Sequence, residues 1–124
     1  MKNIIIILFA LFVSSAYAQD SATCSKGSRI PTPKKQFVSD SISSNFRLYV
    51  IGGIAAVIKP KDKDFAEKSG FQYHDFGCLA PADMSFYVTY NQMVLEHLNK
   101  KLPQDWQKEV IVNTIGLKEW RKRQ

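Results

Sequence analysis

The feature that most limits the fold is the uneven distribution of apolar residues along the chain of 124 residues. From Phe46 to Leu98, 28 of 53 residues are apolar, whereas segment 19–45 has six apolar residues among 27 and nine serines or threonines. A segment as polar as 19–45 cannot bury enough surface to offset the entropy lost on ordering it. We therefore expect a polar flexible tether over 19–45, one small domain over 46–117 and a basic C-terminal tail over 118–124.

The first 18 residues contain the three parts of an export signal in order. Lys2 gives a positively charged start, and the residues from Ile4 to Val13 form an uninterrupted apolar run. Ala16 and Ala18 stand at the two positions where a signal peptidase requires small side chains. Since an apolar helix of this length rises only about 15 Å, it is too short to anchor the chain in a bilayer. We expect cleavage after Ala18, export to the periplasm or the cell exterior, and no transmembrane segment in the mature chain.

The apolar segment predicts a small α+β domain. Its β-branched and aromatic residues from Phe46 to Ile58 are interrupted by Gly52-Gly53, which favours a β-hairpin, with a single bulged strand as the alternative. A short helix should follow Pro60 and end at Gly70, because glycine readily takes the positive φ that closes a helix. Alternation of side chains then predicts a third strand over 71–76.

A long helix is expected from about Pro81 to Lys101, because apolar and aromatic residues recur there on one broad face. That face contains Phe86, Tyr87, Tyr90, Met93, Val94, His97 and Leu98. Pro103 favours a further helix through Trp106, and 110–115 either continues this helix, which we favour, or forms a final strand. In the expected fold, the hairpin and the third strand pack on the long buried helix and on the C-terminal helix.

The two cysteines, Cys24 and Cys78, both belong to the exported chain, so we predict that they form a disulfide. Closing a loop of this size removes about 4 kcal/mol of unfolded-state entropy in the chain-entropy model. The alternative is a thiol-dependent enzyme or redox protein that uses Cys78, because the N-terminus of a following helix lowers the pKa of a thiol. No second cysteine stands three residues away, as in redox motifs, so we favour the disulfide.

Motifs for other chemistry are incomplete. Asp75-Phe76-Gly77 matches the tripeptide that holds magnesium in protein kinases, but neither a glycine-rich phosphate loop nor a catalytic loop accompanies it. No nucleophile elbow or dinucleotide fingerprint occurs, and His74, Asp75 and Cys78 repeat no known spacing of metal ligands. We predict no catalytic residue, cofactor or metal, and we favour a non-enzymatic protein in which His74 and Asp75 are candidate binding residues.

The C-terminus is basic, with four cations and one carboxylate between positions 118 and 123. The cations are Lys118, Arg121, Lys122 and Arg123. Positive charge is otherwise spread along the chain without a basic-aromatic platform, so we do not expect nucleic acid as a partner. We expect an exported module that binds a protein or a component of the cell envelope. The alternative to this role, besides the thiol enzyme, is binding of polyanions or a membrane surface through these four residues.

Several short runs of the chain also occur together in a known group of proteins. These runs are 64–68, His74-Asp75-Phe76-Gly77-Cys78, Tyr90-Asn91, 98–101, 106–109 and Ile115-Gly116. In these runs the chain resembles a group of small exported bacterial proteins of unknown function. The resemblance covers 51–117, is strongest in the Asp-Phe-Gly-Cys run, and implies a genuine domain without implying a mechanism.

Overall fold

The computed structural model describes residues 30–124, so the predicted signal peptide and Cys24 lie outside the described range. Within that range the chain forms four α-helices, one 3-10 helix and two β-strands, which confirms the α+β class. The elements are α1 (Pro33–Ser43), β1 (Phe46–Val50), α2 (Pro60–Ser69), β2 (Phe71–Asp75), α3 (Ser85–Lys101), η1 (Trp106–Lys108) and α4 (Leu117–Arg121).

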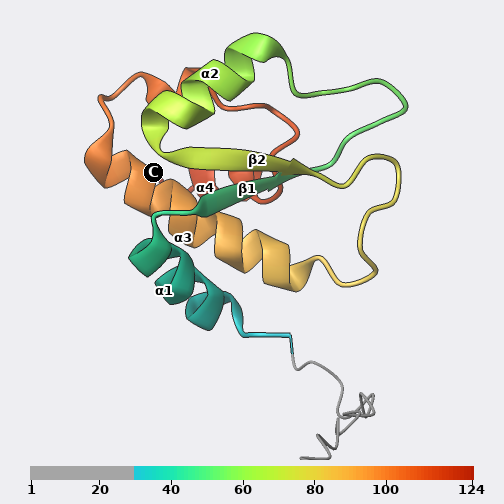
Figure 1. Ribbon diagram of the computed structural model, residues 1–124, viewed down its shortest axis with the longest axis horizontal. Coiled ribbons are helices and arrows are strands. Elements are labelled where there is room, and N and C mark those ends of the chain that lie inside the picture. Colours follow the sequence, from blue (N-terminus) through green and yellow to red (C-terminus); the bar gives the residue numbers. More distant parts are fainter. Residues whose placement is uncertain (1–29) are drawn as a thin grey trace, which may run out of the picture.

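The two strands are parallel neighbours, and α2 lies between them in the chain (Figure 1). Their register pairs Phe46 with Phe71 and Val50 with Asp75. The strand predicted over 71–76 is therefore present, but it is the direct partner of β1. The predicted hairpin is wrong, because the chain leaves the sheet after β1 and returns through a helix.

Both edges of β1 are occupied, which explains why no hairpin strand follows it. One edge pairs with β2, and the other faces segment 113–115. There the Ile51 N–H donates to the Asn113 carbonyl at 3.1 Å, and the Ile115 N–H donates to the Tyr49 carbonyl at 3.0 Å. Residues 54–58, which we expected to form the second hairpin strand, find no free edge of β1 and are irregular.

Helix α2 follows its local sequence signals. Pro60 occupies the first turn, where its missing N–H costs no hydrogen bond. The Asp62 carboxylate accepts the Lys59 N–H at 2.8 Å and so caps the helix start. Gly70 ends the helix with a φ of 79°, which confirms the predicted stop.

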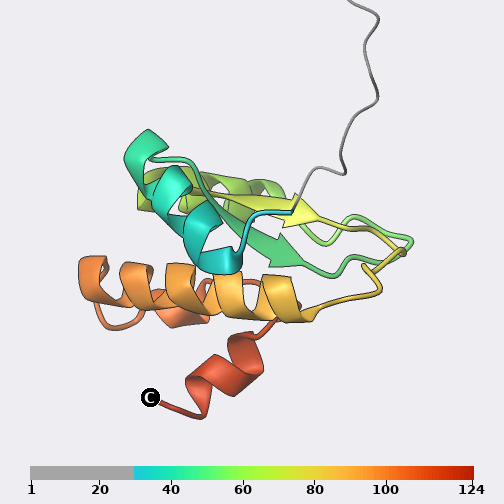
Figure 2. The ribbon, with the colours of Figure 1, turned by 90° about the horizontal axis from the view of Figure 1, so that it is seen from below.

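Helix α3 lies along the β1 side of the sheet, and Figure 2 shows it between the sheet and α4. The helix begins at Ser85, four residues after the predicted start at Pro81, since the Asp83 carboxylate accepts the Ser85 N–H at 2.9 Å. Its buried residues are Tyr90, Asn91, Val94, Leu95 and Leu98. No helix in the described part of the chain has both the length and the apolar character needed to cross a membrane.

Helix α1 lies inside segment 19–45, so the prediction of a flexible tether is wrong for 33–43. Thr32 accepts the Lys35 N–H at the helix start. The ring of Phe37 contacts that of Phe46, with a centroid distance of 5.4 Å. Packing against β1 and α3 thus orders a helix that is too polar to be expected from composition.

The C-terminal part differs from the sequence prediction at two places. The helix expected after Pro103 is reduced to η1, and 110–115 forms neither a helix nor a full strand, because Thr114 makes one antiparallel bridge with Val50. Helix α4 then occupies part of the predicted basic tail. Its Trp120 is fully buried and packs against Trp106, so 118–124 is not a wholly solvated tail.

Candidate functional site

The carboxyl ends of β1 and β2 point to the same end of the molecule, the position at which open α/β sheets bind ligands (Figure 1). Asp75 and Gly52 lie in close contact there, since a Cβ added to Gly52 would come within 2.1 Å of Asp75 Oδ1. The same Oδ1 accepts the Gly77 N–H at 2.7 Å. The Asp75 carboxylate therefore holds the turn after β2 in place.

His74 lies on the opposite face of β2 from Asp75, because successive strand residues alternate. The His74 ring centroid is 5.3 Å from that of Tyr49 and 5.0 Å from that of Phe76, both edge to face. Its side chain is exposed beside this aromatic cluster. The two candidate binding residues are thus not brought together into one site.

Cys78 is exposed in loop 76–84, shortly after β2. Its predicted partner, Cys24, is outside the described range, so the disulfide stays a prediction. Between residues 30 and 124 no group of three or more His, Cys, Asp or Glu side chains is arranged to hold a metal ion. The structure shows that the Cys78 side chain is exposed, so solvent and thiol reagents can reach it.

The two loops at the strand ends form an uncharged surface. Neither 51–58 nor 76–82 contains a charged residue. Ile54 is completely exposed and Leu79 is 85% exposed, both unusual for large apolar side chains. The sequence interpretation missed this surface because it assigned the apolar run after β1 to a second hairpin strand.

The basic C-terminal residues converge around a groove beside α4. The groove has a volume of about 360 Å³ and is lined by Val112, Leu117, Lys118, Arg121 and Lys122. Lys118 and Arg121 are three residues apart and share a face of α4, and Lys122 is the residue that ends the helix. Val112 is 81% exposed at the groove. Of the four predicted cations, Arg123 alone is not part of the lining.

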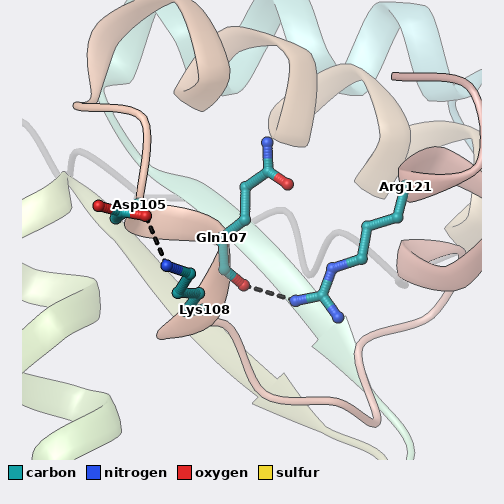
Figure 3. A network of polar contacts seen from close by, with 4 residues as sticks. All are labelled: Asp105, Gln107, Lys108 and Arg121. Atoms are coloured by element: carbon teal, nitrogen blue, oxygen red, sulfur yellow. Dashed lines mark hydrogen bonds and ion pairs between the residues drawn. The ribbon is translucent and has the colours of Figure 1, made fainter.

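Arg121 differs from the two lysines of the groove in being held by a neighbouring element. Its guanidinium donates to the Gln107 carbonyl of η1, as Figure 3 shows. Across residues 30–124, the sole ion pair joins Lys108 Nζ to Asp105 Oδ1 at 2.7 Å. Lys118 and Lys122 are thus exposed charges that no carboxylate of the described chain neutralises.

Asn91 is a buried residue to which the sequence interpretation gave no structural role. Its side chain is fully buried, accepts the Tyr49 N–H at 3.0 Å and donates to the carbonyls of Tyr49 and Ile115 at 2.8 and 2.9 Å. The amide thereby joins α3, β1 and the segment before α4. A lone asparagine among apolar neighbours on a helix is the signal that could have identified it.

Tyr90, next to Asn91, makes a second buried contact that the sequence interpretation missed. Its hydroxyl donates to the Asp40 carboxylate of α1 and accepts the Arg47 N–H at 3.4 Å. Burial, together with the hydrogen bond to Asp40, raises the pKa of the Tyr90 hydroxyl above its ordinary value. The phenol therefore remains a neutral donor, which links α1 to α3 and β1.

No protein-family model, curated protein or solved structure matches this chain. The resemblance to small exported bacterial proteins therefore stays a prediction.

Proposed function

We propose that this protein is an exported, non-enzymatic module that binds the anionic surface of an envelope membrane through α4. The observation that carries the proposal is one groove, whose lining includes the exposed Val112 together with Lys118, Arg121 and Lys122. Lys118 and Arg121 share a face of α4, Lys122 directly follows the helix, and Arg121 is oriented by its bond to the Gln107 carbonyl.

The chemistry of the groove favours an amphiphile over an anionic sugar polymer. Each lysine or arginine beside an anionic bilayer contributes about 1 kcal/mol to the free energy of binding. A sugar polyanion would bind to the same charges, so the cations alone do not distinguish the two ligands. An exposed valine gains free energy only when its apolar surface leaves water, as it does at the boundary between headgroups and acyl chains. The exposed Val112, which lines the same groove as the cations, therefore supports a lipid surface.

The alternative of a thiol-dependent enzyme receives less support from the surroundings of Cys78. A reactive cysteine needs a neighbouring base or cation that stabilises its thiolate. Asp75 is bound to the Gly77 N–H, and His74 lies on the other face of β2, among aromatic rings. Neither side chain is arranged as a base for the thiol.

Sedimentation of the mature protein with phospholipid vesicles tests the proposal. We expect retention on phosphatidylcholine vesicles that contain phosphatidylglycerol, weak retention on pure phosphatidylcholine, and release by added salt. Replacing Lys118 and Lys122 together by alanine should reduce the free energy of binding by about 2 kcal/mol, which lowers the affinity for these vesicles roughly 30-fold. The control replaces Lys34 and Lys35 of α1, which are also exposed and carry the same charge.

A second pair of variants separates a lipid surface from a sugar polyanion. Val112→Ser should weaken vesicle binding and leave binding to heparin unchanged. Ile42→Ser is its control, since Ile42 is 82% exposed on α1, far from the groove in sequence. Equal losses in the two lysine pairs, or vesicle binding that ignores both Val112 and salt, would refute the proposal.

A further inference from the structure

Three uncharged segments meet at the carboxyl end of the sheet. They are the loop after β1 (51–58), the loop after β2 (76–82) and 110–117, which leads into α4, and none of them contains a charged residue. Figure 1 shows the two loops together at the end to which both strand arrows point. This end of the described domain is therefore neutral over three separate stretches of the chain.

Close contacts hold the three segments against one another. Asp75 joins the two loops, because its Oδ1 accepts the Gly77 N–H at 2.7 Å and a Cβ added to Gly52 would come within 2.1 Å of the same atom. The third segment is attached to the first through the Ile51 N–H, which donates to the Asn113 carbonyl at 3.1 Å. The fold itself therefore brings the three segments to one place.

Each segment exposes one large apolar side chain. Ile54 is completely exposed in the first loop, Leu79 is 85% exposed in the second, and Val112 is 81% exposed in the third. The first loop stands clear of the domain, since a Cβ added to Gly53 would meet no atom of the described chain within 4 Å. Apolar side chains that project in this way gain free energy only from a partner that removes them from water.

The third segment connects these apolar side chains to the cations of α4. Val112 lines the same groove as Lys118, Arg121 and Lys122. Exposed apolar side chains next to cations match the boundary of an anionic bilayer, where lipid phosphates lie beside acyl chains. An apolar protein surface would match the apolar side chains alone. The charge of the adjoining groove therefore favours a membrane as the partner of the three segments.

We propose that the three segments form a membrane-inserting end of the protein, with Ile54, Leu79 and Val112 in the outermost layer of acyl chains. This inference rests on the proposed function and names the side chains that enter the bilayer. Insertion is shallow, because backbone groups without internal hydrogen bonds are costly to remove from the hydrated headgroup region. No hydrogen bond joins the backbone of 52–58 to the rest of the described chain, so this backbone stays among the headgroups.

Tryptophan fluorescence on vesicles tests the insertion directly. The mature protein with Ile54→Trp is mixed with vesicles of phosphatidylcholine and phosphatidylglycerol whose acyl chains carry bromine, a quencher that acts at short range. We expect the added tryptophan to lose roughly half of its fluorescence or more. Ile42→Trp is the control, since Ile42 is exposed on α1, and it should lose none. Trp106 and Trp120 are buried, so the unchanged protein gives the background signal.

The affinity for the same vesicles gives a second test. Ile54→Ser combined with Leu79→Ser should lower this affinity roughly tenfold or more, because both side chains lose their burial in the bilayer. The dependence of binding on salt should stay that of the unchanged protein, since no charge is altered. The matched control combines Ile42→Ser with Val38→Ser, two exposed apolar residues of α1, and should leave the affinity unchanged.

The possible results separate this inference from the proposed function. Vesicle binding that requires Lys118 and Lys122, but without quenching of the added tryptophan, would overturn the insertion and leave the proposed function standing. If the unchanged protein does not bind these vesicles, both are wrong. A dimer in solution that dissociates on Ile54→Ser with Leu79→Ser, while vesicle binding stays unchanged, would assign the segments to a contact between two copies of the chain and so contradict the insertion.

Discussion

The outer edge of β1 and the loops at the strand ends differ in how their backbone groups are hydrogen-bonded. At the β1 edge, Asn91 and segment 113–115 satisfy the N–H and the carbonyl of Tyr49. In the first loop, no hydrogen bond joins the backbone of 52–58 to the rest of the described chain, and Ile54 projects into solvent. The contrast separates the residues that hold the fold together from those that are free to vary at little cost in stability.

The largest effect should come from removing the side chain at the centre of the β1 edge. Asn91→Ala breaks three hydrogen bonds in a fully buried position and leaves the Tyr49 N–H without a partner. We expect the free energy of unfolding to fall by about 4 kcal/mol. Urea denaturation measures the loss, with Gln92→Ala, one residue along α3, as a control that changes it by less than about 1 kcal/mol.

Tyr90→Phe, at the same edge of β1, should lower the free energy of unfolding by less than Asn91→Ala does. It removes one hydroxyl and leaves the Asp40 carboxylate with a single side-chain partner, Gln36. Because hydrogen bonds to charged groups are the stronger ones, we expect a loss of about 2 kcal/mol. If the bond between the two side chains is the cause, Asp40→Asn should reduce the effect of Tyr90→Phe in a double-mutant cycle.

A pH-dependent loss of stability should follow from His97, which packs against Phe37 and Phe46 where α1, β1 and α3 meet. Burial lowers the pKa of His97 in the folded protein, and Lys101 and Lys100 lower it further. The folded state thus binds the His97 proton less tightly than the unfolded chain does, so stability is full above pH 6.5 and falls as the pH drops through the folded pKa. Melting temperatures measured across this pH range should show a smaller acid loss in His97→Gln than in the unchanged protein.

The smallest effect is expected at the strand ends. Replacing Ile54 and Leu79 together by serine should change the free energy of unfolding by less than about 0.5 kcal/mol, because neither side chain is buried. Urea denaturation measures this change in the free energy of unfolding. A loss near that of Tyr90→Phe would show that the loops contribute to the core, and the contrast between the two regions would disappear.

Sequence signals predicted the elements that depend on local chemistry. Gly70 ends α2 because the helix needs a residue with positive φ there, and α3 follows its apolar periodicity. Alternation of side chains correctly predicted a strand after Gly70, which the structure has as β2. In each of these cases the deciding interaction lies within a few residues of the chain.

The parts that sequence reasoning missed depend on contacts between distant residues. The hairpin prediction could not take into account that Asn91, 42 residues after Tyr49, occupies the edge of β1. Helix α1 is polar by composition, and its order depends on Asp40, whose partner Tyr90 is 50 residues away. The basic residues of the candidate site were recognised from their charge, but the exposure of Val112 beside them depends on how 110–115 folds back onto β1.

The residues that pair with the outer edge of β1 come much later in the chain, and this affects how the protein folds during synthesis. A polypeptide that emerges N-terminus first presents β1 long before Asn91 and Ile115, the residues that close its outer edge. Until Ile115 emerges, the backbone groups of Tyr49 lack part of their final partners and can pair with another chain. The domain should therefore fold only after Ile115 has emerged, and fragments that end before it should be targets for chaperones and proteases.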